Sequence, residues 1–200
     1  MNTISNALFW ISNGLLVPVI VLLILFLLRA LILAGGFFGE YYRRRSLFSR
    51  FTAVLEGDAA AREAGLKSLV ERPGADRMPL LRTAGQMLSH RGDTPWCERL
   101  LANYEVDAER ELGHSRTLAK LGPMLGLMGT LIPMGPALVG LAAGDLASMA
   151  YNMQVAFATT VVGMLIAAIG VVTLQVKQRW YARELNDLEF LSRNLCDEKE

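Results

Sequence analysis

Three threonine hydroxyls lie inside two long apolar runs and are the side chains of this sequence best suited to chemistry. Thr130 lies near the middle of the first run, and Thr159 and Thr160 lie in the part of the second run nearer the connecting loop. Antiparallel helices would bring them to similar depths. A lone threonine in a membrane helix usually bonds back to its own helix. Three at matched depth favour a polar passage or a contact with a partner helix.

Small residues accompany these hydroxyls at spacings of three and four. In lipid, faces of small residues allow helices to approach closely, because apolar burial no longer drives association. Close packing is therefore the simpler interpretation of the pattern, and a channel wall is the functional one. The predicted helix-packing positions are Pro123, Gly126, Gly129, Gly163 and Ala167.

Acidic and basic side chains are almost absent from the same region. Between Leu121 and Val176 the only Asp, Glu, Lys, Arg or His is Asp145, at the connecting loop. A proton relay normally uses an ionisable group within the membrane. If the chain serves an ion pathway, another subunit must supply the acid.

The rest of the sequence offers no catalytic or metal-binding arrangement. His90 and His114 each lack a second His or Cys at ligand spacing, so both are interpreted as surface or packing residues. The carboxylates of 105–111 interleave with Arg110 and Arg116, as on a solvated helix face. We therefore predict a non-enzyme without metal or cofactor.

The composition predicts a polytopic membrane protein. Hydrophobic residues make up 52% of the 200 positions and are gathered into blocks. A net charge of +1 gives no reason to expect nucleic-acid binding. We expect an all-α fold with three transmembrane helices and long helices that extend into a cytoplasmic helical domain. Cys97 and Cys196 fall in the segments expected in the cytoplasm, which predicts reduced thiols without a function.

The first span is predicted in the segment 1–38, with its membrane core at about 8–28. Arg29 marks the end of this membrane core, because a charged side chain near the end of a span can reach the headgroups. Pro18 is tolerated within such a span. No basic residue precedes the apolar run and no small-residue cleavage site follows it, so we expect it to remain as a span.

The region 39–120 is predicted to be a cytoplasmic helical domain, broken near 56–58, 72–74 and 91–95. Its last helix is expected to run from about Pro95 into the second span. These helices are too few to bury their own apolar faces, which favours a bundle shared between subunits. The predicted N-caps are Asp58, Asp76 and Thr94.

The region 121–176 is predicted to be a transmembrane hairpin with spans at about 121–143 and 150–174, followed by a cytoplasmic helix at 177–200. Basic residues follow the first span, precede the second and follow the third, so the positive-inside rule places the N-terminus outside and the C-terminus in the cytoplasm. These residues are Arg43, Arg44, Arg45, Arg50, Arg110, Arg116, Lys120, Lys177, Arg179 and Arg183.

Two strings in the hairpin resemble the MotA/TolQ/ExbB family of ion-channel subunits. Residues 123–130 read Pro-Met-Leu-Gly-Leu-Met-Gly-Thr, and 156–163 read Ala-Phe-Ala-Thr-Thr-Val-Val-Gly, with the basic exit Lys-Gln-Arg at 177–179. The order of spans is most similar to the three-span ExbB/TolQ branch. The resemblance implies a homo-oligomer, expected to be a pentamer, in the lipids of the prokaryotic inner membrane. It also implies a single-span partner resembling ExbD or TolR, whose membrane aspartate carries the proton.

The resemblance further implies that Thr130 and Thr160 face the partner's aspartate. The sequence departs from the family at Val155, where relatives often have glutamate, and at Pro133 and Pro136, which predict a kink or break in the second span. The identity of the ion, H⁺ or Na⁺, and the process that is driven stay open: import, envelope maintenance, motility or another.

Two other classes of function are compatible with a membrane hairpin. A non-conducting scaffold would use the glycine faces only to hold a complex together, without dependence on an ion gradient. A substrate transporter is disfavoured because the chain lacks the inverted repeat and the intramembrane charges typical of that class.

Overall fold

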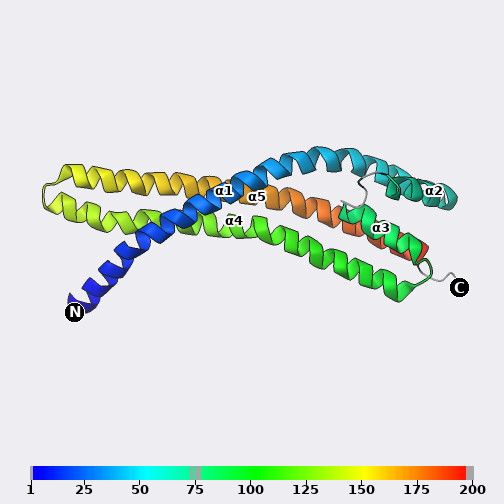
Figure 1. Ribbon diagram of the computed structural model, residues 1–200, viewed down its shortest axis with the longest axis horizontal. Helices are drawn as coiled ribbons and strands as arrows, with labels where there is room; N and C mark the ends of the chain where they lie inside the picture. Colours follow the sequence, from blue (N-terminus) through cyan, green and yellow to red (C-terminus); the bar gives the residue numbers. More distant parts are fainter. Residues whose placement is uncertain (1, 73, 75–77, 197–200) are drawn as a thin grey trace. The chain divides into compact units, whose positions relative to one another are not determined.

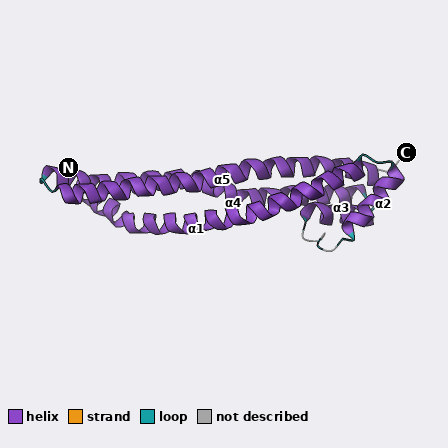
Figure 2. Ribbon diagram, turned by 90° about the horizontal axis from the view of Figure 1, so that it is seen from above, coloured by secondary structure: helices purple, strands orange, loops and turns teal. Residues whose placement is uncertain are grey.

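The computed structural model describes residues 2–72, 74 and 78–196, and consists of helices joined by short turns (Figures 1 and 2). No strand occurs within these ranges, and the predicted all-α fold is confirmed. The predicted N-cap at Asp76 lies outside the described residues. The helices are α1 (Asn2–Leu55), α2 (Ala59–Val70), α3 (Pro79–Ser89), α4 (Thr94–Ala142) and α5 (Leu146–Leu195).

Three helices, α1, α4 and α5, are long and apolar enough to cross a membrane, as the hydropathy predicts. They contain 54, 49 and 50 residues. A span needs only about 20 residues, so each of them continues well beyond the length of a bilayer. The expected continuous helix from about Pro95 into the second span is confirmed by α4.

The chain divides into two compact units, and all three long helices contribute to both. Unit 1 comprises Met1–Gly36 and His114–Leu174, and unit 2 comprises Phe37–Gly113 and Gln175–Glu200. The short helices α2 and α3 belong to unit 2 alone. Unit 1 contains the hairpin with the three threonines.

The core of unit 1 is a stripe of aliphatic side chains on α1, α4 and α5. Its α1 members are Val19, Leu23 and Ala30, whose spacings of four and seven residues place them on one helix face. Side chains on the other faces, such as Val17 and Ile32, are apolar and exposed. Helices that are apolar on all sides are typical of membrane spans. The remaining core members are Leu118, Leu125, Ile132 and Ile166.

The turn between α4 and α5 is short and closed by backbone bonds. Gly144 has φ +76, a conformation that favours glycine. The Gly144 N–H donates to the Leu141 carbonyl, and the Asp145 N–H donates to the Gly140 carbonyl. The Asp145 carboxylate accepts from the Ser148 N–H at 3.0 Å, so the one acidic residue of the hairpin caps α5.

Helix α4 passes through Pro123, Pro133 and Pro136 without a break, so the part of the prediction that allowed a break is wrong. Each proline removes only one backbone donor, and neighbouring helices and backbone adjustments make such losses tolerable within a membrane helix. Pro133 is fully buried, so its ring is part of the packing of the unit.

The start of α4 is capped by Asp93 and not by the predicted Thr94. The Asp93 carboxylate accepts from the Trp96 N–H at 3.1 Å. The Thr94 hydroxyl instead donates to the Cys196 carbonyl at 2.8 Å. Asp58 precedes α2 in an extended conformation without a side-chain cap bond, so its predicted capping bond is also not formed.

Candidate functional site

The small residues of α4 and α5 pack against one another within unit 1. A Cβ atom on Gly163 would lie 2.7 Å from both the Gly122 carbonyl oxygen and the Gly126 Cα. A Cβ on Gly122 would lie 2.9 Å from the backbone nitrogen of Ala167. The two backbones therefore approach as closely as glycine permits. We call this contact the α4–α5 seam; it contains Gly122, Gly126, Gly129, Thr159, Gly163 and Ala167.

Thr159 belongs to the seam, which corrects the expectation that it faces an ion pathway or a partner. It is 8% exposed, and a Cβ on Gly129 would lie 2.6 Å from its Cβ. Its hydroxyl donates to the carbonyls of Val155 and Ala156, at 3.1 and 2.9 Å. Thr159 fills the space that Gly129 leaves and is covered by the chain's own helix. Pro123, another predicted packing residue, lies on an exposed side of α4.

Thr130 and Thr160 are only half-buried, and both keep part of their surface open. The Thr130 hydroxyl donates to the Leu127 carbonyl at 2.7 Å, and the Thr160 hydroxyl donates to the Ala156 carbonyl at 3.0 Å. Each oxygen still has lone pairs that can accept a hydrogen bond or contact a cation. Gly126 lies four residues before Thr130 on α4, and a Cβ on it would lie 3.7 Å from the Thr160 Cα.

The surface around these two hydroxyls is apolar. Leu127, Leu131, Phe157, Val161 and Met164 are each exposed by 60% or more. Such a surface accepts apolar helices or lipid, and it disfavours an ionised group except where a hydroxyl or water can solvate it. The arrangement offers polar contacts without a proton carrier of its own.

Unit 2 contains a buried charged network that the sequence interpretation missed. Arg44 pairs with Glu184 at 2.5 Å and with Glu40 at 2.9 Å, and the Tyr104 hydroxyl donates to Glu184. Lys177, 9% exposed, pairs with Glu40 at 3.2 Å. The membrane topology alone explains Arg44 in the sequence, as one of the basic residues that follow the first span. The spacing of four between Glu40 and Arg44 was the available signal, because it places both on one helix face.

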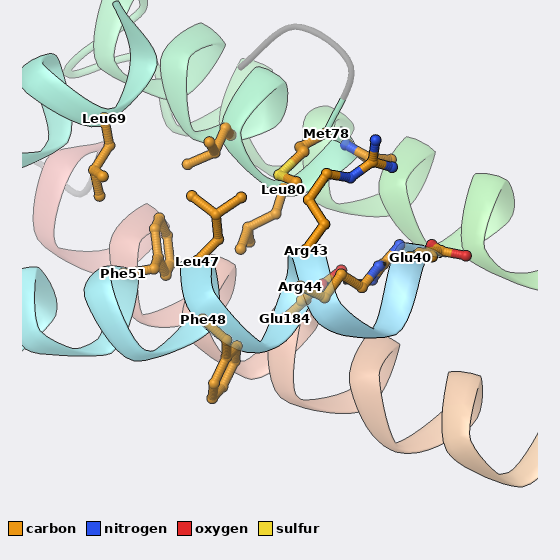
Figure 3. Close-up of a pocket in the computed structure, with 12 residues that line it drawn as sticks. Glu40, Arg43, Arg44, Leu47, Phe48, Phe51, Leu69, Met78, Leu80 and Glu184 are labelled. Atoms are coloured by element: carbon orange, nitrogen blue, oxygen red, sulfur yellow. Dashed lines mark hydrogen bonds and ion pairs between the residues drawn. The ribbon is translucent and has the colours of Figure 1, made fainter. Parts of the chain in front are cut away.

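Figure 3 shows Glu40, Arg44 and Glu184 of this network at one end of a small cavity. The side chains gathered towards the other end are those of Leu47, Phe51 and Leu69. The cavity has a volume of about 50 Å³. That space suits a few water molecules and is too small for a substrate. The network is better explained as a link that holds α1 against α4 and α5 within unit 2.

Burial governs the electrostatics of the network. It raises the pKa of the Glu184 carboxyl, although Arg44 and the Tyr104 hydroxyl act in the opposite direction. It also raises the pKa of Tyr181 to about 12. Burial alone would lower the pKa of Arg44, but the Glu184 and Glu40 carboxylates outweigh it and raise that pKa. Arg44 is therefore a permanent cation in this site.

The raised pKa of Glu184 predicts a pH-dependent effect of Glu184→Gln. The folded state binds the proton of the Glu184 carboxyl more tightly than the unfolded chain does, in which the pKa of this carboxyl is near 4.5. The resulting stability is complete below about pH 4.5 and is lost as pH rises through the folded pKa, by at most about 1.4 kcal/mol per pH unit. We expect the free energy of unfolding of the variant to equal that of the wild type at low pH and to exceed it increasingly as pH rises. The measurement is a set of unfolding curves recorded from pH 4 to 8.

The matched control is Glu111→Gln. The Glu111 side chain is 58% exposed, and its contact with Lys177 is long, at 3.8 Å. This variant is expected to keep the pH dependence of the wild type. A Glu184→Gln variant that loses stability relative to the wild type as pH rises would contradict the prediction.

Comparison with known proteins identifies a family that includes the hairpin. The model of the MotA/TolQ/ExbB proton channel family matches residues 82–189, which is more than half of the chain and includes Thr130 and Thr160. A comparison with curated proteins finds no significant match. Together with its three helices able to span a membrane, the match shows that this chain is a membrane protein that belongs to the MotA/TolQ/ExbB proton channel family.

Proposed function

We propose that the chain is the channel subunit, or stator, of an energy-transducing motor complex in a prokaryotic cytoplasmic membrane. Several copies, expected to be five, would surround a single-span partner that carries a membrane carboxylate. Proton or sodium flow past that carboxylate drives the partner. The observation that carries the proposal is the pair of half-buried hydroxyls, Thr130 and Thr160, on a hairpin of the family that has no acidic residue except Asp145.

The hydroxyls give the partner's carboxylate a place where either protonation state is tolerated. A protonated carboxyl donates to the free lone pairs of Thr160 while the Thr160 hydroxyl stays on the Ala156 carbonyl. An ionised carboxylate needs a donor, which the hydroxyl supplies by rotating away from that carbonyl. Next to Val161 or Phe157 the ionised form has no such donor and is disfavoured. Loss and gain of the proton therefore bias where the partner helix rests.

The orientation follows from the basic residues that flank the spans. Arg43 and Arg44 follow the first span, Lys120 precedes the second, and Lys177 follows the third. We place these residues and unit 2 in the cytoplasm and the Gly144 turn on the opposite side. The buried ion pairs of Arg44 and Lys177 would then hold the long helices together just below the membrane.

The assembly is tested by electron microscopy of the purified chain in lipid nanodiscs. A five-fold ring around an apolar central cavity supports the proposal, and a monomer or dimer would overturn it. The same preparation, made with a single-span protein encoded by a neighbouring gene and carrying a membrane aspartate, should hold that helix inside the ring.

A non-conducting scaffold remains the second candidate, and two observations favour it. The seam glycines are used by the chain's own helices, and both open threonines donate to their own backbones. If the chain is a scaffold, the function that it restores to a deletion strain should persist when a protonophore is added. A stator predicts that the complemented function is lost when the protonophore is added.

A further inference from the structure

The two cysteines of the chain form a disulfide, which corrects the expectation of reduced thiols. Cys97 lies in the first turn of α4 and Cys196 directly follows α5, 99 residues later in the sequence. Their Cα atoms are 6.5 Å apart, within the range that a disulfide spans. Both residues are 0% exposed. Nothing local in the sequence indicates that the end of α5 meets the start of α4, so the pairing could not be predicted.

Two hydrogen bonds join the same chain ends beside the disulfide. The Thr94 hydroxyl donates to the Cys196 carbonyl at 2.8 Å, and the Gly92 N–H donates to the Leu195 carbonyl at 3.1 Å. The start of α4 has further support of its own, because the His90 ring stacks on Trp96 at 5.0 Å between centroids. The end of α5 is held by the burial of Leu191 and Leu195, and beyond Leu195 its tie to the start of α4 is the disulfide and these two hydrogen bonds.

We propose that Cys97–Cys196 is a redox-cleavable latch that holds the end of α5 on the start of α4. The orientation proposed above places it in the cytoplasm, where disulfides are usually transient or redox-sensing. A cellular dithiol would reduce it: one thiolate attacks a sulfur to form a mixed disulfide, and the second releases it. Two electrons and two protons pass to Cys97 and Cys196, and the dithiol becomes a disulfide.

Reduction is expected to loosen unit 2 locally without unfolding it. The buried side chains of Leu188 and Leu191 still anchor the preceding two turns of α5. Only the last turn, around Leu195, loses its covalent tie; it keeps the burial of the Leu195 side chain and the two hydrogen bonds to the start of α4. Local opening of a helix end is far less costly than global unfolding. Because both cysteines are buried, the reductant reaches them only through such openings.

The first test is a tryptic digest without reductant, of protein whose free thiols were alkylated in the intact cells. A linked pair of peptides covering 92–99 and 194–199 is expected in a measurable fraction of the protein. Complete alkylation of both cysteines in the cells, with no link formed when protein purified without alkylation is oxidised, would overturn the proposal.

The second test is hydrogen exchange of the purified chain with and without dithiothreitol. Reduction should speed exchange of the last turn of α5 on the order of tenfold, with little change at Leu188. The variant C97S/C196S is the matched control and should show the fast exchange in both conditions. Equal exchange of the oxidised and reduced wild type would overturn the latch. Neither test depends on ion flow, so its failure would leave the channel proposal standing.

Discussion

Replacing Thr160 by valine is expected to reduce ion-driven work by about 10- to 100-fold, because a hydrogen bond to a charged group contributes about 1.5–3 kcal/mol. Valine keeps the shape of threonine and removes the only polar atom of the side chain. The lost hydroxyl bond to Ala156 lies within one helix, so folding and assembly should be retained. The measurement is the protonophore-sensitive phenotype of a complemented deletion strain, read beside the amount of assembled complex in its membranes.

Thr173→Val is the matched control for this substitution. Thr173 lies on the same helix, is 3% exposed, and donates to the Ile169 and Gly170 carbonyls at 2.7 and 3.1 Å. The Thr173→Val variant also loses a hydroxyl, but this hydroxyl does not face an open surface, so full activity is expected. Thr160→Ser should also retain activity. Equal loss in Thr160→Val and Thr173→Val would assign the effect to packing, and full activity of Thr160→Val would contradict the proposed mechanism.

The long helices could be predicted because their signal is one-dimensional. Blocks of apolar residues longer than a bilayer requires are visible without any knowledge of tertiary contacts. The extension of α4 far beyond its span was predictable for the same reason, since nothing between Thr94 and Leu121 stops a helix. The continuity of α4 through Pro133 and Pro136 was not predicted, because it depends on neighbouring helices that the sequence does not show.

The direction in which each polar residue points could not be predicted. Thr159 and Thr160 are neighbours in sequence, and a rotation of about 100° between consecutive helix positions separates the seam from the open face. The seam glycines indicated a close approach, but their spacing does not say whether the approaching helix belongs to the same chain. The partner proved to be α5 of the same hairpin.

The contacts of unit 2 were missed because they join distant parts of the sequence. Arg44 and Glu184 are 140 residues apart, and Cys97 and Cys196 are 99 apart. In the sequence, Arg44 belongs to a basic cluster that the membrane topology already explains. Burial changes its role from a surface charge to half of an ion pair, and burial is a property of the packed helices.

Gly163→Ala is expected to destabilise unit 1 by about 1–3 kcal/mol, the usual cost of an overpacked site. The new methyl group would lie 2.7 Å from the Gly122 carbonyl oxygen and the Gly126 Cα, which are backbone atoms that cannot rotate aside. The helices must therefore separate. The measurement is unfolding in detergent micelles, followed by the loss of helical signal.

Gly113→Ala is the control of opposite sign, because a Cβ at this position of α4 meets nothing within 4 Å. Alanine there should stabilise the chain by up to about 1 kcal/mol. Equal stabilities of Gly163→Ala and the wild type would show that α4 and α5 do not approach as closely as described.

Separation of the helices would also uncover Thr159, so Gly163→Ala should lower ion-driven work while Gly113→Ala retains it. In the proposed mechanism, the close seam keeps Thr159 covered and leaves Thr160 as the hydroxyl open to the partner.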